Sequence, residues 1–188
     1  MQKYGGIGLL AIVCALAACG GRSNVSPANA GLTPPVGTGM TIEAQLPKNT
    51  IGEELPSEGV GTKKDPVWGL VGGFTQTNTA QVLAFPPGTT ITIMNLSHSV
   101  PHTLDVVRKV KKPPAKFPTN PSLSVQAQGN GILGKGYASG SIGPGKSVSV
   151  KLSNAGIYLI GCAFHYSEGM QDVILVKAHA TPGPQFVR

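Results

Sequence analysis

Ten residues near the end of the chain, GCAFHYSEGM at 161–170, carry its most informative pattern. Cys162, His165 and Met170 lie in it at the spacing C-x2-H-x4-M, which puts a thiol, an imidazole and a thioether on one short loop. Such soft, mixed ligands suit copper in electron transfer when two histidines and one cysteine form a trigonal plane with a weak axial methionine. The loop supplies one histidine of that plane, so the second must come from elsewhere in the chain.

A candidate for the second histidine lies upstream. His102 stands in the stretch NLSHSVPHTL, residues 95–104. Taken singly, each residue has an ordinary interpretation, since free cysteine is often a small buried hydrophobic residue, methionine fills gaps and histidine often lies on the surface. The loop spacing, together with the Pro101-His102 pair after a β pattern, favours a metal site. His98 and His179 are interpreted as loop and tail histidines outside that site.

Together the two stretches resemble the cupredoxins, the family of small blue copper proteins. In that family a histidine follows a strand-end Asn and a short loop, often directly after Pro, and the C-x2-H-x4-M loop comes late in the chain. The resemblance covers residues 66–178 and implies one type 1 copper ion as the cofactor. The ligands that it implies are His102, Cys162, His165 and Met170.

The resemblance also implies how electrons leave the site. In the family the loop histidine reaches the surface and passes electrons to redox protein partners, and here that histidine is His165. Phe164, Tyr166 and Pro101 would form an apolar docking patch around it, with packing of Phe164 in the core as the alternative. A backbone N–H of the residue after the first histidine, here Thr103, bonds the cysteine sulfur in the family.

The chain from Pro66 onward has a β pattern. In residues 89–95, Ile91 and Ile93 alternate with threonines, and Gly/Pro-rich turns separate the candidate strands. About eight short strands between turn signals predict an all-β fold, a Greek-key β-sandwich of the cupredoxin type. The predicted strands are residues 68–74, 79–84, 89–95, 102–107, 122–126, 147–152, 158–160 and 173–176.

The N-terminus has the features of an export signal. Residues 1–18 combine a short basic head with an apolar run too short to span a bilayer comfortably. The sequence LAACG around Cys19 resembles the lipobox of bacterial lipoproteins, which implies cleavage before Cys19 and its lipidation. We therefore expect an exported, lipid-anchored protein at the periplasmic face of an outer membrane or at the cell surface. An ordinary secretory signal and an uncleaved anchor are the alternatives.

The following segment differs in composition from the predicted domain. Residues 19–65 are rich in Gly, Pro, Ser, Thr and Asn and lack a sustained apolar period, so they are interpreted as the lipidated cysteine and a flexible linker. The alternative is that part of this segment packs on the domain as an extra strand. The predicted cupredoxin domain spans residues 66–180, and a tail follows at residues 181–188.

Composition limits the partners. The net charge is +7, but no basic aromatic-rich module or Cys/His finger supports nucleic-acid binding. Residues 108–121 are interpreted as a loop, and its basic side chains are either a solvated face or a surface that steers an acidic redox partner. These side chains are Arg108, Lys109, Lys111, Lys112 and Lys116.

The leading functional hypothesis is an electron carrier that is not an enzyme. A single cysteine-centred site with a weak axial methionine suits reversible redox chemistry. The alternative is a copper-binding protein for storage or delivery. A redox enzyme domain is disfavoured because the whole chain has four histidines and no second histidine cluster for a catalytic copper.

Overall fold

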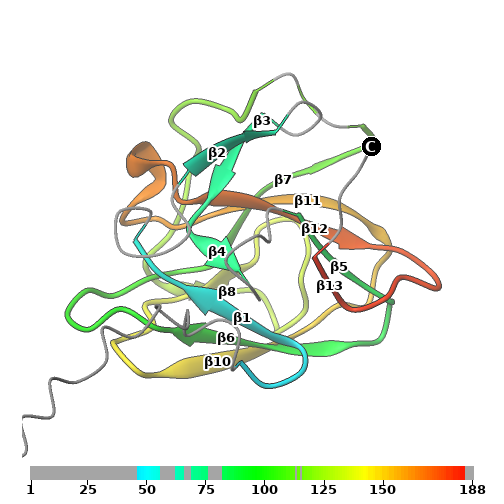
Figure 1. The fold of residues 1–188 in the computed structure, drawn as a ribbon, viewed down its shortest axis with the longest axis horizontal. Coiled ribbons are helices and arrows are strands. Elements are labelled where there is room, and N and C mark those ends of the chain that lie inside the picture. Colours follow the sequence, from blue (N-terminus) through cyan, green and yellow to red (C-terminus); the bar gives the residue numbers. More distant parts are fainter. Residues whose placement is uncertain are drawn as a thin grey trace, which may run out of the picture. The chain divides into compact units, whose positions relative to one another are not determined.

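Two β-sheets face each other across a shared apolar core (Figure 1). The computed structural model describes residues 46–55, 62–65, 69–75, 82–112, 114 and 116–184, all within one compact unit, Thr38–Arg188. Over these residues the regular elements are strands and one short 3-10 helix, η2 (Tyr166–Glu168).

The first sheet, sheet A, has four strands in the order β10-β6-β1-β4. They are β10 (Ser147–Lys151), β6 (Thr90–Asn95), β1 (Thr50–Glu53) and β4 (Phe74–Thr75). The alternation predicted for β6 is present, because Ile91 and Ile93 are fully buried. β1 pairs in parallel with β6 and antiparallel with β4, so it lies between strands that are distant in sequence.

The second sheet, sheet B, follows the order β13-β5-β12-β11-β7-β9-β8, and β3 joins it beside β12. β12 pairs in parallel with β5 and antiparallel with β11, which in turn pairs antiparallel with β7. The strands are β2 (Thr62–Asp65), β3 (Gly69–Gly72), β5 (Val82–Phe85), β7 (Asp105–Val110), β8 (Ala127–Gln128), β9 (Ala138–Ser139), β11 (Gly156–Gly161), β12 (Gln171–Val176) and β13 (Gly183–Pro184).

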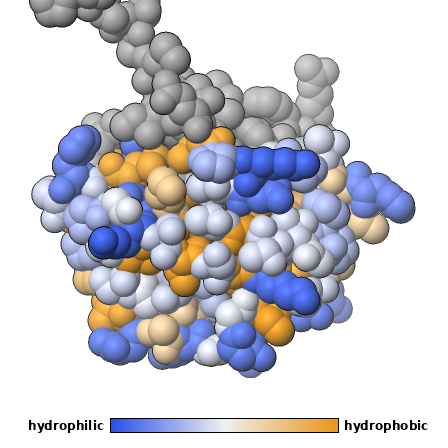
Figure 2. All heavy atoms as spheres, turned by 90° about the horizontal axis from the view of Figure 1, so that it is seen from below, coloured by the Kyte–Doolittle hydropathy of each residue, from blue (hydrophilic) through white to orange (hydrophobic). Residues whose placement is uncertain are grey.

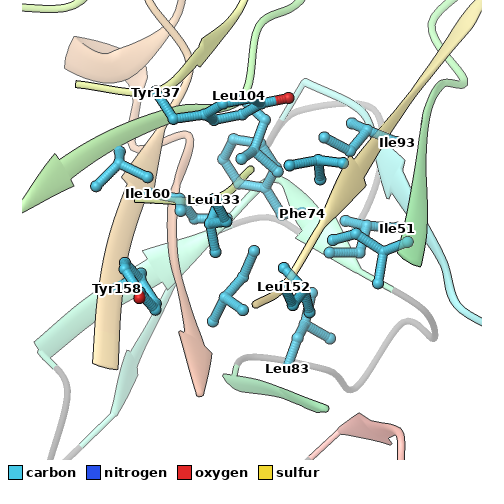
Figure 3. Packing of buried hydrophobic residues seen from close by; sticks show 14 of the residues in the cluster. Ile51, Phe74, Leu83, Ile93, Leu104, Leu133, Tyr137, Leu152, Tyr158 and Ile160 are labelled. Carbon is cyan, nitrogen blue, oxygen red and sulfur yellow. The ribbon is translucent and has the colours of Figure 1, made fainter. Parts of the chain in front are cut away.

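The core fills the space between the sheets (Figure 3). Ile51 and Ile93 enter it from sheet A, while Leu83, Tyr158 and Ile160 enter it from sheet B. The chain crosses from sheet B to sheet A between β5 and β6 and back between β6 and β7, as Greek-key links do. The all-β sandwich predicted from the sequence is therefore confirmed.

The domain boundaries differ from those expected. β1 and β2 lie before Pro66, and β13 lies in the stretch interpreted as the tail, yet all three belong to the sheets. β1 gave no sequence signal because it is four residues long and has one large apolar residue, Ile51. β1 is ordered because it pairs with β6. It therefore matches the alternative expectation, in which part of the predicted linker packs on the domain as an extra strand. The predicted signal, Cys19 and the linker up to residue 45 lie outside the described residues.

The basic segment is also partly strand. β7 continues to Val110, so Arg108 and Lys109 stand on a strand rather than in a loop, and both are exposed. The strand expected at residues 122–126 is instead the two-residue β8. No helix among the described residues is long and apolar enough to cross a membrane. On the face shown in Figure 2, hydrophilic residues interrupt the hydrophobic areas.

Candidate metal centre

A buried asparagine fixes the segment that leads to the first histidine. Asn95, the last residue of β6, donates hydrogen bonds through Nδ2 to the carbonyls of Val100 and Ile142, both at 2.8 Å. Its Oδ1 accepts the N–H of Ser97 at 2.9 Å. The backbone of His102 then exchanges two hydrogen bonds with Ile142, at 3.0 and 2.8 Å. The imidazole of His102 is thus carried on backbone that is held on both sides.

The loop after β11 closes on itself. The N–H of Cys162 donates to the carbonyl of Met170 at 3.2 Å, and the N–H of Met170 donates to the carbonyl of His165 at 3.2 Å. The chain turns back through η2 and Gly169, whose φ of 94° lies in the left-handed region that glycine adopts readily. Local backbone bonds therefore set the positions of the loop residues. The orange loop in Figure 1 is this segment.

The fold brings three of the four predicted ligands together. The Nδ1 atoms of His102 and His165 are 3.1 Å apart, and they lie 3.7 and 3.5 Å from the Sγ of Cys162. His102 and Cys162 are fully buried, whereas His165 is half-buried. Among the described residues, this is the one group of three or more His, Cys, Asp or Glu side chains that is close enough to hold an ion.

The size of this triangle fits a first-row metal ion. A point equidistant from the three atoms in their plane is about 2 Å from each, given their separations of 3.1, 3.5 and 3.7 Å. Bonds from imidazole nitrogen and thiolate sulfur to zinc, a metal of the same row, are about 2.0 to 2.3 Å. The His102–Cys162–His165 group can therefore bind one copper ion, for which this donor set is well suited.

Backbone N–H groups surround the sulfur. Thr103 donates its N–H to the Sγ of Cys162 at 3.3 Å, as predicted from the resemblance. The N–H groups of Phe164 and His165 also hydrogen-bond this sulfur and favour its thiolate form. In addition, the hydroxyl of Thr103 accepts the N–H of Ala163 at 2.8 Å, so its side chain ties the two ligand-bearing segments together.

A serine that the sequence reasoning passed over orients the first histidine. The Oγ of Ser97 lies 2.7 Å from the Nε2 of His102. With the proton on Nε2 and donated to Ser97, the Nδ1 of His102 has a free lone pair that faces the group. A sequence signal for the position of Ser97 existed, because an asparagine side chain commonly bonds the backbone N–H two residues on, as Asn95 does here.

Burial controls the protonation of the group. It lowers the pKa of His102 to about 4, with a further contribution from His165, so this imidazole is neutral at ordinary pH. It raises the pKa of the Cys162 thiol to about 11, and the charge of Glu53 adds to the rise. Without a metal the cysteine is therefore a thiol, and binding of a metal would release its proton.

Met170, the fourth predicted ligand, is fully buried. A Cβ placed on Gly73 would lie 2.7 Å from the Cγ of Met170, so this side chain packs directly against the backbone before β4. Its role as the axial ligand stays a prediction. His98 and His179 are exposed and do not belong to the group.

The surface beside the group differs in part from the expected patch. Phe164 is exposed, at 39%, and its ring centroid lies 6.1 Å from that of His165. Tyr166 is instead buried and donates its hydroxyl to the carbonyl of Pro118 at 2.9 Å, so its inclusion in an exposed patch was wrong. Beside the loop lies a groove of about 770 Å³, lined in part by Phe164 and by residues 116–121.

Comparisons with known proteins give structural matches and no sequence matches. No protein-family model matches the chain, and no curated protein matches it. A variant of amicyanin in the Cu(I) state is 19% identical over 52% of this chain and 70% of its own, with a TM-score of 0.35. A purple cupredoxin from Nitrosopumilus maritimus is 22% identical, over 51% and 77%, with a TM-score of 0.33. A copper-containing nitrite reductase from Thermus scotoductus is 18% identical, over 57% and 20%, with a TM-score of 0.36.

Proposed function

We propose that this chain is an exported electron carrier with one type 1 copper ion. The observation that carries the proposal is the convergence of two imidazole Nδ1 atoms and one thiol sulfur within 4.8 Å of one another. His102, Cys162 and His165 would hold the ion, and Met170 would be its fourth ligand. Copper, when bound, supplies a one-electron couple, and the protein's task is to hold the ligands for both oxidation states.

The surroundings of the ligands support electron transfer rather than catalysis. His102 is oriented by Ser97, and the sulfur of Cys162 by the N–H of Thr103. Ligands held in this way move little between oxidation states, which lowers the cost of reorganisation. The described residues hold no second metal-binding cluster where a substrate reaction would take place.

The exposed edge of the site suggests where partners dock. His165 is half-buried, and the exposed Phe164 stands beside it. We place the electron exit at His165 and the partner, a cytochrome or an oxidoreductase, on this face. Exposed basic side chains on β7 and the following segment, among them Lys116 at the groove, favour an acidic partner. The lipid at Cys19 would hold the carrier at a membrane.

Colour and voltammetry test the proposal. The Cu(II) protein should show an intense thiolate-to-copper charge-transfer band, and Cys162→Ser should abolish it. His98→Ala is the matched control, because this exposed histidine lies outside the group and its loss should leave the band unchanged. A reversible one-electron wave supports a carrier. A colourless protein that holds only Cu(I) and exchanges it quickly would support storage or delivery instead.

A further inference from the structure

A glutamate side chain is buried in the core. Glu53, the last residue of β1, is fully buried opposite Asn95 in the sheet. Among the described residues, neither of its carboxyl oxygens has a hydrogen-bond partner. Burying an ionised carboxylate in this way costs several kcal/mol, so such a group binds a proton instead. A carboxyl group of this kind in a native protein calls for an explanation.

A second buried carboxyl group raises the pKa of the first. Asp105, the first residue of β7, is 2% exposed, and its Oδ1 lacks a partner among the described residues, while its Oδ2 accepts the N–H of Ser124 at 2.8 Å. The charge of Asp105 raises the pKa of Glu53 further, after burial, to about 8. Two buried carboxylates whose charges interact do not both ionise readily. The pair therefore holds one proton, on Glu53, at neutral pH.

This pair is coupled to the metal centre. The charge of Glu53 raises the pKa of Cys162, so the two groups interact electrostatically. Asp105 reaches the same sulfur through Thr103, whose hydroxyl hydrogen-bonds the Asp105 carboxylate and whose N–H donates to the Cys162 sulfur. Within the described ranges, the other titratable group that interacts with the pair is Tyr137, whose pKa burial and then both carboxylates raise to about 12. It stays neutral over the range in which Glu53 titrates.

A proton has a route to this site. A cavity of about 200 Å³ is lined by Asp105 and Tyr137, together with the polar residues Ser122, Ser124 and Gln128. Ser122 and Gln128 are exposed, so this cavity is lined in part by residues that contact solvent. Asp105 lines this cavity, so it is the carboxyl group of the pair at which a proton from solvent would arrive.

We propose that Glu53 is a buried proton-binding site that takes up one proton when the metal centre accepts one electron and releases it on oxidation. This proposal rests on the proposed electron-carrier function. The electron comes from a one-electron redox protein and the proton from water through Asp105, so the net charge of the interior is unchanged by the cycle. The added electron disfavours an ionised Glu53, and oxidation disfavours the extra proton.

The proposal predicts a pH-dependent reduction potential. Where reduction takes up one proton, the potential falls by about 59 mV per pH unit for a one-electron couple. The reduced centre, with thiolate and Cu(I) charges balanced, resembles the metal-free thiol in charge. The pKa of Glu53 in the reduced protein should therefore be near its value without metal, about 8. The potential should depend on pH below about pH 8 and be constant above it.

Two measurements test the proposal with the full chain. In the metal-free protein, the infrared carbonyl band of a protonated carboxyl group should be present at neutral pH, disappear near pH 8 and be absent in Glu53→Gln. In the copper-loaded protein, the slope of potential against pH should be lost in Glu53→Gln. Glu168→Gln is the control, since it removes an equal but exposed charge from the ligand loop and should change neither result.

The outcomes separate this proposal from the proposed function. A carbonyl band that is missing in the wild type or retained in Glu53→Gln overturns the buried proton. A reversible couple whose slope is the same in both proteins overturns the coupling and leaves the carrier function intact. A protonated Glu53 in a protein without a reversible couple overturns the carrier function, and the coupling with it. If Glu53→Gln fails to fold, Asp105→Asn replaces it and should shift the band's titration to lower pH.

Discussion

Replacing Glu53 with glutamine should change how the stability of the metal-free protein depends on pH. Burial, and then the charge of Asp105, raises the pKa of Glu53 from 4.5 to about 8 in the folded chain. A carboxyl group with a higher pKa in the folded state binds its proton more tightly there than in the unfolded state. Its stabilising effect is therefore complete below pH 4.5 and is lost as the pH rises through about 8.

The shift sets the size of the effect. One pKa unit corresponds to about 1.36 kcal/mol, so the rise from 4.5 to about 8 corresponds to a loss of about 5 kcal/mol of unfolding free energy. About 3 kcal/mol of this loss falls above about pH 6, given the same conversion. Burial also raises the pKa of Asp105 to about 6, but its contribution ends below that range. Cys162, with a pKa of about 11, titrates above it, and His102, whose pKa burial lowers from 6.5 to about 4, changes the stability only below about pH 6.5.

Denaturant unfolding of the metal-free protein, followed by circular dichroism from about pH 6 to about pH 9, measures this loss. Wild type and Glu168→Gln should lose stability together as the pH rises, whereas Glu53→Gln should stay level and be the more stable protein at the alkaline end. Glutamine keeps the shape of the side chain and carries no titrating proton. Parallel curves for all three proteins would contradict this expectation, because Glu53 would then have the same pKa in the folded and unfolded states.

The remaining predictions concern the fourth ligand and the anchor. Gly73→Ala should cost more stability than Gly131→Ala in denaturant unfolding, because both glycines have positive φ but only at Gly73 would the added Cβ meet Met170, at 2.7 Å from Cγ. An equal loss in the two variants would show that Met170 is free to move away. Cys19→Ser should move the protein from the membrane to the soluble fraction, whereas Cys14→Ser, within the predicted signal, should not, because stable attachment needs the acyl chains. Retention of Cys19→Ser at the membrane would exclude lipidation as the anchor.

The ligand loop could be predicted from the sequence because its conformation depends on contacts between residues that are close in sequence. Cys162, His165 and Met170 stand on one turn whose backbone hydrogen bonds run between those same residues. Their spacing therefore carries most of the information about their arrangement. His102 was a longer inference, because its approach depends on two strands, β7 and β11, that pair antiparallel and bring Asp105 opposite Gly161. The alternating pattern of the strands was enough to predict a sandwich and not their register.

Elements without a local signal were missed. β1 reads as a polar, glycine-containing segment, and its burial follows only from its position between β4 and β6. Tyr166 lies in a polar loop, where an aromatic residue is expected at the surface, but the carbonyl of Pro118 accepts its hydroxyl and lets the ring be buried. In both cases the partners lie more than twenty residues away in sequence, so periodicity over a short window cannot reveal them.

Nothing in the sequence indicated strand β1, and for the same reason nothing in it indicated the buried carboxyl group of Glu53. A glutamate at the end of a polar segment is normally interpreted as solvated, since Glu is almost never fully buried without a partner. Pairing of β1 with β6 places Glu53 opposite Asn95, the residue that also holds the His102 segment. The same strand that completes sheet A therefore brings a carboxyl group, which has no hydrogen-bond partner in the described part of the chain, within electrostatic reach of Cys162. The ligand types follow from the loop alone, whereas the charge that surrounds them depends on a strand that precedes the motif by about a hundred residues.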